Sequence, residues 1–402
     1  MGFVGEGRMS LKQAAAAMGV SYRQAKRIKA NFLIGGPARI ANQNRGRSAP
    51  NKTSAETAQT VRELAQDKYR DFNDTHFTEM LAEFEKINLG RETVRQIKRA
   101  AGIKPKNRRR PKRHHGRRPP KDCYGEMIQW DGSHHQWFGE DKPQQCLFAA
   151  VDDATNQVLA LHFEPTETAI GYLRTLKDII ESAGIPAAIY HDKHSSLHRN
   201  DNYWTLEEQI AGKQEPTQVG MVLQELGITA IPAHSPQAKG RVENEFKTLQ
   251  DRLVAEMKLF NIKSPEEANP WIKNYFLPRF NKKFSRQPAQ KHSLFRKPTG
   301  INLDTVIAFR YKATVANDNT IKINNLIIQI PPGKAGRGFA KARVEARQSL
   351  DGQWRVYYQK QIIATQKSNT VRPPEIKRRK QPPTARAAAN VEWSGEAESL
   401  TP

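Results

Sequence analysis

The stretch that decides the fold is Cys146-Leu-Phe-Ala-Ala-Val-Asp-Asp-Ala-Thr-Asn-Gln-Val-Leu-Ala-Leu-His-Phe163, in which two apolar runs flank a short polar turn. This pattern predicts two strands, Cys146–Val151 and Val158–Phe163, joined as a hairpin. A third strand is predicted at Met127–Asp131, before a turn around Gly139. Because the connections between these strands are short, we expect an antiparallel meander.

Helices and strands alternate after the meander. Gly184 and Pro186 end a helix predicted at Thr168–Ala183, and a strand at Ala187–His191 follows. A helix around Val219–Leu226 then leads to a strand at Ile228–Ile231. Strands that alternate with helices pair in parallel. Three meander strands followed by such units are typical of a ribonuclease-H-like α/β sheet.

Three acidic residues stand at the ends of these elements. Asp131 closes the first strand, Asp192 follows the strand Ala187–His191, and Glu243 lies in Ser235-Pro-Gln-Ala-Lys-Gly-Arg-Val-Glu, where Ser and Pro predict a helix start. Each acid alone is better explained as a turn or cap residue. Together they predict a site that binds two divalent metal ions, either Mg²⁺ or Mn²⁺. Such a site supports phosphodiester chemistry.

The helix that carries Glu243 has a clear apolar side. We expect a buried stripe that consists of Val242, Phe246, Leu249, Leu253 and Met257. Glu243 lies beside this stripe, on the same edge as Lys247 and Gln250, so it can project towards the sheet. Lys239, Arg241 and Lys247 are candidate contacts to a DNA backbone, although a solvated helix face explains them nearly as well.

Other polar residues compete for roles in this site. Asp152 and Asp153 could bind metal, but their position between two strands favours turn chemistry. For His191, His194 and His198 we favour phosphate contacts or surface placement over a zinc site, because their spacing spans a strand end rather than a helix face. His134 and His135 directly follow Asp131 and could lie near a scissile phosphate.

The composition indicates a partner of opposite charge. The formal net charge is +24 in 402 residues, and 37% of the residues are hydrophobic. Such an excess favours nucleic acid as the partner, while the apolar content is sufficient for folded domains. No apolar run reaches the ~20 residues of a membrane span, so we expect a cytoplasmic, nucleoid-associated protein without a membrane partner. The only cysteines, Cys123 and Cys146, exclude a disulfide framework and a cysteine-rich zinc site.

Two basic helical units are predicted before the α/β region. The first, residues 1–45, has two short helices around Met18-Gly19-Val20 and is interpreted as a helix-turn-helix, with an ordinary helical hairpin as the alternative. The second covers residues 51–103. The candidate DNA-binding residues in the two units are Arg23, Lys26, Arg27, Arg91, Arg95, Lys98 and Arg99.

The remaining segments are a linker, a second β region and a tail. Residues 104–121 are rich in proline and basic residues, including Arg108, Arg109 and Arg110, and we expect this linker to follow a DNA groove or phosphate backbone. The catalytic core is placed at 122–290. Short alternating strands predict a small β-barrel at 300–370, and the basic residues 371–402 are expected to be disordered.

Several motifs together resemble a known family. Trp130-Asp-Gly-Ser-His-His, Val151-Asp-Asp-Ala-Thr, Tyr190-His-Asp-Lys-His-Ser and the segment from Ser235 to Glu243 are similar to the core of ISNCY-type insertion-sequence transposases, relatives of the DDE transposases and retroviral-type integrases. The resemblance implies that Asp131, Asp192 and Glu243 are the catalytic, metal-binding acids. The polar stretch 198–218 looks like a loop inserted between the second and third of these acids.

The resemblance implies a transposase that binds the terminal inverted repeats of a mobile element, cuts DNA and joins the ends to a target. Double-stranded DNA would be its partner, and a homo-oligomer assembled on DNA would hold two ends together. Two alternatives stay open: a domesticated, non-catalytic DNA-binding regulator, and a hydrolytic nuclease of the same fold.

Overall fold

The computed structural model describes residues 1–41, 52–106, 118–199, 203–233, 240–323, 326–368 and 371. The chain divides into two compact units, one formed by Met1–Asp67 with Leu89–Lys104 and the other by Lys68–Asn88 with Pro105–Pro402. The six domains predicted from the sequence stay a prediction.

The first unit is helical. Ser10 and Ser21 cap α2 and α3, because their hydroxyls accept hydrogen bonds from the backbone of Gln13 and Gln24. Gly19, with φ of +65°, makes the turn between these helices, a conformation that suits glycine. The two helices around this turn are those predicted for a helix-turn-helix. The described elements of this unit are α1 (Gly2–Gly5), α2 (Leu11–Ala17), α3 (Tyr22–Gly35), η1 (Pro37–Arg39), α4 (Ala55–Gln66) and α6 (Arg91–Ala100).

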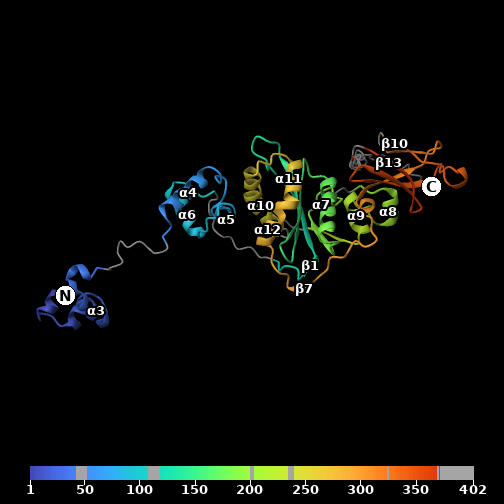
Figure 1. The fold of residues 1–402 in the computed structure, drawn as a ribbon. Coiled ribbons are helices and arrows are strands. Elements are labelled where there is room, and N and C mark those ends of the chain that lie inside the picture. The colour runs from blue at the N-terminus through green and yellow to red at the C-terminus, as the bar shows by residue number, and fades with distance from the viewer. Residues whose placement is uncertain are drawn as a thin grey trace, which may run out of the picture. The chain divides into compact units, whose positions relative to one another are not determined.

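A sheet flanked by helices forms the centre of the second unit (Figure 1). It has five strands in the order β4-β3-β2-β5-β6. Strands β2, β3 and β4 pair antiparallel, whereas β5 pairs parallel with both β2 and β6. The predicted meander and the predicted parallel strands are confirmed, and their order is that expected of a ribonuclease-H-like sheet. The strands are β2 (Ile128–His135), β3 (Gln145–Asp152), β4 (Val158–Glu164), β5 (Ala188–His191) and β6 (Thr229–Pro232).

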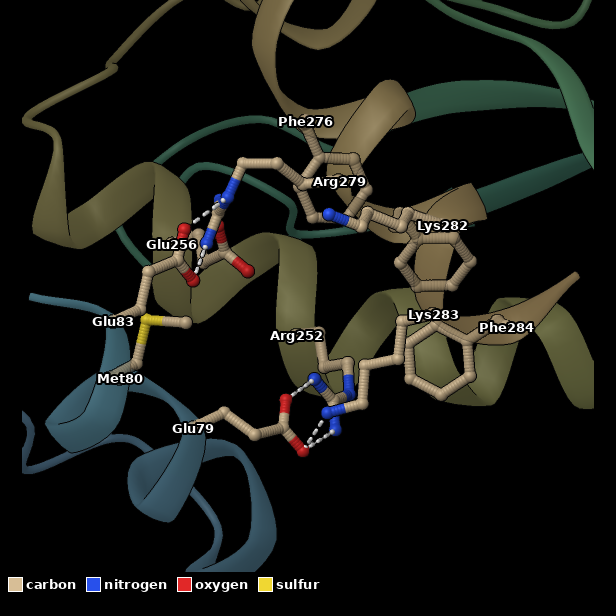
Figure 2. Close-up of a pocket in the computed structure, with 11 residues that line it drawn as sticks. Glu79, Met80, Glu83, Arg252, Glu256, Phe276, Arg279, Lys282, Lys283 and Phe284 are labelled. Carbon is tan, nitrogen blue, oxygen red and sulfur yellow. Dashed lines mark hydrogen bonds and ion pairs between the residues drawn. The ribbon is translucent and has the colours of Figure 1, made fainter. Parts of the chain in front are cut away.

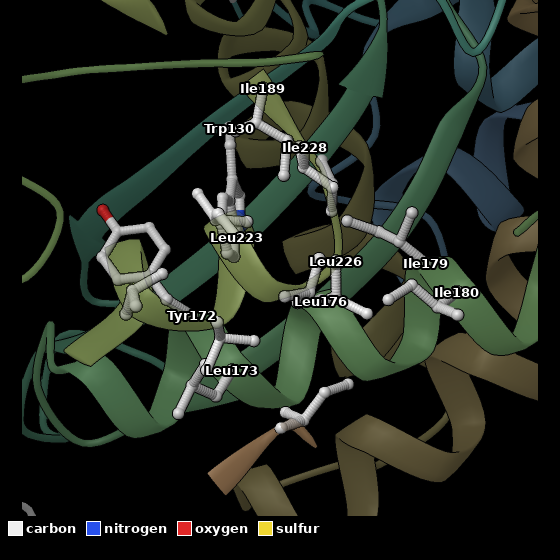
Figure 3. Packing of buried hydrophobic residues seen from close by; sticks show 14 of the residues in the cluster. Trp130, Tyr172, Leu173, Leu176, Ile179, Ile180, Ile189, Leu223, Leu226 and Ile228 are labelled. Carbon is white, nitrogen blue, oxygen red and sulfur yellow. The ribbon is translucent and has the colours of Figure 1, made fainter. Parts of the chain in front are cut away.

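Helices cover both faces of this sheet. On one face, α7 (Ala169–Ser182) and α9 (Gln218–Glu225) bury a core that includes Trp130 and Tyr172, whose rings meet edge to face (Figure 3). On the other face lies α10 (Gly240–Leu259), whose predicted apolar stripe is buried, together with α11 (Pro265–Trp271), η3 (Ile272–Phe276) and α12 (Leu277–Phe284). The stretch 198–218, predicted as an inserted loop, contains the short helix α8 (Leu206–Ala211).

Helix α5 (Asp74–Glu83) is held against α10 and α12 by a network of charged side chains (Figure 2). Arg252 of α10 donates two hydrogen bonds to Glu79, at 2.6 and 3.0 Å. Arg279 of α12 bonds both Glu83 and Glu256, and Glu256 also contacts buried His76 at 3.0 Å. The network fixes one short helix to the two helices behind the sheet.

The C-terminal region differs from its prediction. Strands β8 (Ala308–Thr314), β11 (Arg343–Ser349), β12 (Gln353–Tyr358) and β13 (Gln361–Lys367) form a four-stranded antiparallel sheet, while β9 (Thr320–Ile323) and β10 (Leu326–Gln329) form a separate two-stranded one. Both sheets pack around one small core. Strand pairing does not link the two sheets in the described residues, so the small β-barrel predicted at 300–370 is not confirmed.

Four further short elements complete the described fold. Strand β1 (Cys123–Tyr124) pairs in parallel with β7 (Gln290–Ser293), and α13 (Leu303–Val306) precedes β8; η4 covers Lys334–Gly336. Within the ranges given above, no helix has both the length and the apolar character needed to cross a membrane.

Candidate active site

Asp131 and Asp192 lie level with each other at two neighbouring parallel strands. Asp131 lies within β2, which continues to His135, so the prediction that it closes this strand is wrong, whereas Asp192 directly follows β5. The register of β2 with β5 pairs Trp130 with His191, and each aspartate is the next residue along the chain. A common metal site for the two acids stays a prediction.

Helix α10 crosses the sheet at Asp131. The backbone N–H of Val242 donates to Oε1 of Gln129 at 3.2 Å, and Nε2 of Gln250 lies 3.5 Å from the hydroxyl of Ser133. Gln129 and Ser133 flank Asp131 by two residues on either side, and alternate residues of a strand share a face. Asp131 therefore faces α10.

Glu243 is the acidic residue in the first turn of α10 and its side chain is exposed. The helix itself is fixed by the buried stripe beside Glu243. Glu243 thus lies on the helix that contacts β2 on both sides of Asp131, and its role as the third acid stays a prediction.

Asp153, which the sequence assigns to turn chemistry, instead holds this end of α10. Asp153 has no exposed surface and accepts hydrogen bonds from Nε2 of Gln129 at 2.7 Å and from the backbone N–H of Lys121 at 2.8 Å. It also forms ion pairs with Arg118 at 2.6 Å and with Arg241 at 2.9 Å. Asp153 therefore ties together the end of the linker, β2 and the start of α10.

Asp152 has a different task from its neighbour. One of its oxygens accepts from the backbone and hydroxyl of Thr155, at 2.8 and 2.7 Å, and the other accepts from the backbone of Gly125 at 2.9 Å. These are the turn contacts that the sequence predicts for this position. Burial raises the pKa of Asp152. Neither aspartate of the pair is oriented as a metal ligand by these contacts.

Glu167 is a fourth acid near the site, and sequence analysis missed it. Its Oε1 accepts a hydrogen bond from the hydroxyl of Tyr172 at 2.5 Å, and its Oε2 lies 3.2 Å from Nε2 of His134. Nδ1 of His194 is 3.7 Å from Oε1. Glu167 stands between a strand and a helix, as many cap residues do, so its spacing alone gave no signal.

The neighbouring histidines divide into several environments. His191 is buried, and its Nδ1 lies 2.5 Å from the backbone oxygen of Asp192, so the surface placement considered for it is wrong. The backbone N–H of His194 donates to Oδ1 of Asp192 at 2.9 Å. The ring of His135 packs edge to face on Trp137. Contacts of the other histidines to phosphate stay a prediction.

Comparison with known proteins decides the family. A protein named as a transposase, y4bF of Sinorhizobium fredii (strain NBRC 101917 / NGR234), is 33% identical over 86% of this chain and 75% of its own length. The chain belongs to this transposase family. The transposase for insertion sequence IS1202 of Streptococcus pneumoniae is 28% identical over 90% of this chain and 84% of its own length.

A helix-turn-helix domain model matches residues 4–49 of the present chain, which confirms the interpretation of its first helices. Solved structures with some likeness include the HTLV-2 integrase catalytic core domain in complex with magnesium, 16% identical over 37% of this chain and 85% of that chain, with a TM-score of 0.26. The catalytic core domain of BIV integrase is 21% identical over 44% of this chain and 94% of that chain, with a TM-score of 0.27. TM-scores this low do not establish a common fold, so the family rests on the sequence relatives.

The candidate DNA-binding residues of this transposase differ in exposure. Arg23, Lys26 and Arg27 of α3 are exposed, as are Arg91 and Arg95 of α6, where Arg95 pairs with Glu92. Lys98 is only 3% exposed, and Arg99 donates to the backbone of Ile103. DNA contacts by all these residues stay a prediction.

The other candidate contacts lie near the core. Lys247 is exposed, while Arg241 is held by Asp153 and also donates to the backbone oxygen of Arg118 at 3.2 Å. Arg108, Arg109, Arg110 and Lys239 lie outside the described residues. Contact of Arg241 with DNA would require it to share or leave its place beside Asp153.

The donor set fits a hard divalent cation. Asp131, Asp192 and Glu243 offer only carboxylate oxygens, the ligands that Mg²⁺ and Mn²⁺ prefer. The three acids come from β2, from the residue after β5 and from the first turn of α10. The chemistry of these donors therefore fits the metal that the sequence predicts.

Proposed function

We propose that this member of the transposase family is a DDE transposase that binds the terminal inverted repeats of an insertion sequence, cuts the DNA strands there and joins them to target DNA. The observation that carries the proposal is the register of β2 with β5, which sets Asp131 of β2 level with Asp192 just after β5, together with the contacts of the Glu243 helix on both sides of Asp131. The named transposases among the relatives of this chain support the same proposal.

Asp131, Asp192 and Glu243 would hold two Mg²⁺ or Mn²⁺ ions, which when bound activate the attacking oxygen and stabilise the leaving oxygen of a phosphodiester. The protein itself supplies the position of these acids. Strand register aligns the two aspartates, and the contact of Val242 with Gln129 sets the start of α10 over β2. Basic side chains of the helix-turn-helix unit, and of the linker, would meet phosphates.

The proposed reaction has two phosphoryl transfers. Water attacks a phosphodiester at each end of the element, which frees a 3′-hydroxyl, and this hydroxyl then attacks a phosphodiester of the target. Each step forms one P–O bond and breaks another, so the joining step needs no external energy source and no covalent intermediate with the enzyme. Because two ends are joined together, the active form would be a homo-oligomer assembled on DNA.

The test uses purified full-length protein and labelled DNA that carries the ends of its own element, with Mg²⁺ or with EDTA. We expect nicking and strand transfer with Mg²⁺ only. Asp131→Asn, Asp192→Asn and Glu243→Gln should each abolish both reactions while the affinity for the end DNA is kept. Glu140→Gln, which removes an exposed glutamate outside the site, serves as the control and should stay active.

The alternatives are outcomes of the same experiment. A hydrolytic nuclease would nick the DNA without forming strand-transfer products. A non-catalytic regulator would bind the ends tightly, with no cleavage by the wild type under conditions where paired ends assemble. Either result would overturn the proposed transposase activity.

A further inference from the structure

A second group of potential metal ligands lies on the opposite face of β2 from Asp131. Trp130, Gly132 and His134 alternate with Asp131 along the strand, and Trp130 packs against Tyr172 of α7, so this face is the one away from α10. His134 pairs in register with Cys146 of β3. One ligand atom from each of His134, Cys146 and Glu167 lies within 4.8 Å of the others.

Gly132 leaves room for these three side chains to approach. A Cβ atom at this position would lie 3.0 Å from Sγ of Cys146 and 3.0 Å from Cδ of Glu167. A glycine inside a strand commonly marks such a close approach. A larger residue at position 132 would press on the thiol of Cys146 and the carboxylate of Glu167, which come from two different segments of the chain.

We propose that His134, Cys146 and Glu167 form a binding site for a thiophilic divalent transition metal of the Zn²⁺ class, separate from the carboxylate site of the proposed function. A set of one nitrogen, one sulfur and one oxygen donor suits such a metal and disfavours Mg²⁺, which takes oxygen ligands. Three protein ligands would leave the fourth position of a tetrahedral ion to water.

One of the three distances between ligand atoms is close to that of a tetrahedral site, and the other two are within 4.8 Å. Bonds of 2.0–2.3 Å at tetrahedral angles place neighbouring ligand atoms roughly 3.3–3.7 Å apart. Nε2 of His134 and Oε2 of Glu167 are 3.2 Å apart, so a metal could bind between them after a small shift. The hydroxyl of Tyr172 holds the other oxygen of Glu167 at 2.5 Å, as an outer partner that orients a ligand carboxylate.

The site is accessible, and metal binding there would displace a proton. Burial raises the pKa of Cys146 to about 12, so the thiol is protonated at neutral pH and a bound metal would have to take the place of its proton. The side chain of His134 is 47% exposed, so ions can reach the group from its side.

The experiment is a titration of the full-length, reduced, metal-free protein with Co²⁺, a spectroscopic substitute for Zn²⁺. We expect a sulfur-to-cobalt charge-transfer band in the near ultraviolet, which Zn²⁺ removes and a large excess of Mg²⁺ does not. Because the chain has two cysteines, Cys123→Ser is the matched control and should keep the band, whereas Cys146→Ser should lose it.

Two further variants protect the test against misfolding and against confusion with catalysis. His134→Gln changes an exposed side chain and should weaken Co²⁺ binding at least about tenfold without changing the melting temperature of the metal-free protein. Asp131→Asn should abolish DNA cleavage but keep the band. The proposal would be overturned by the absence of a band in the wild type, by a band that survives in Cys146→Ser, or by unchanged affinity in His134→Gln.

Discussion

Asp153 is a buried carboxylate that interacts with four hydrogen-bond or ion-pair donors. A buried charge is tolerated only when it is paired and hydrogen-bonded, and here the partners come from the end of the linker, from β2 and from α10. Through Arg241 and Gln129 it fixes the first turn of α10, which carries Glu243. We therefore interpret Asp153 as a positioning residue for the third acid.

We expect Asp153→Asn to reduce DNA cleavage about ten- to a hundredfold while the affinity for end DNA is unchanged, because a small displacement of Glu243 impairs catalysis more than binding. Arg241→Gln should have the same effect. If the two residues act through each other, the double variant is no slower than the slower single variant. Purely additive losses, or a loss of DNA affinity in Arg241→Gln, would instead indicate that Arg241 contacts DNA.

Glu245 of α10 should make stability depend on pH. One of its carboxylate oxygens is buried with no hydrogen-bond partner among the described residues, and burial raises its pKa to about 7. A glutamate in the unfolded chain has its ordinary, lower pKa. The protonated Glu245 therefore contributes to the stability of the folded protein. This contribution is fully present below pH ~4.5 and is lost as the pH rises through about 7.

Replacing Glu245 with Gln should stabilise the protein at pH 8, by on the order of 1–3 kcal/mol, and much less at pH 5. Chemical denaturation at both pH values measures the difference. Glu140→Gln, at an exposed position, should give no such dependence. An equal effect of Glu245→Gln at both pH values would mean that the folded protein does not disfavour the ionised carboxylate.

Sequence reasoning located some of these residues and missed others for a physical reason. Asp131 and Asp192 were predictable because each follows an apolar run, and neighbouring parallel strands bring such positions level with each other. Glu167 and Asp153 also make contacts with residues far away in the sequence, such as His134, 33 positions from Glu167, and Arg118, 35 positions from Asp153. No local pattern in the sequence records those contacts.

At the scale of elements, α5 is a helix that charged side chains hold against the core. Arg279 bridges Glu83 of α5 and Glu256 of α10, and Glu256 is only 5% exposed (Figure 2). Removing the guanidinium would leave a buried carboxylate facing only His76, whose pKa burial lowers, so this histidine is a weak source of positive charge at neutral pH.

We expect Arg279→Met to weaken the attachment of α5 by on the order of 2 kcal/mol. Hydrogen exchange measures this locally: the amides of α5 should lose protection, while those of the central sheet keep it. Lys282→Met, on the exposed side of the same helix, is the matched control and should change protection by less than about 0.5 kcal/mol. Equal losses in both variants would contradict the role given to the network.

The C-terminal strands show where element prediction reached its limit. Alternating residues correctly indicated strands near 308–367, because the period of two is a local property. Whether the strands close into a barrel depends on which edges pair, and this is decided by register and twist across the whole sheet. Here β9 and β10 pair with each other and leave the four-stranded sheet open.

At the scale of the whole molecule, the net charge of +24 predicts DNA binding that weakens steeply with salt. Attraction by the overall charge and binding through a defined surface predict different effects when charges are removed at chosen positions. If α3 meets the phosphates, neutralising Arg23, Lys26 and Arg27 to Gln should reduce the slope of log affinity against log salt by roughly 1–3. The control neutralises the same number of charges in lysines that already pair with acids, namely Lys177, Lys258 and Lys273.

Both triple variants lower the net charge equally, so only the position of the lost charges differs between them. We expect the control to keep nearly the wild-type slope, since its lysines are held by Asp304, Asp71 and Asp178. Fluorescence anisotropy with end DNA over a range of salt concentrations measures all three slopes. Equal changes in both variants would assign the attraction to overall charge, and the helix-turn-helix would then not be the principal DNA-binding surface.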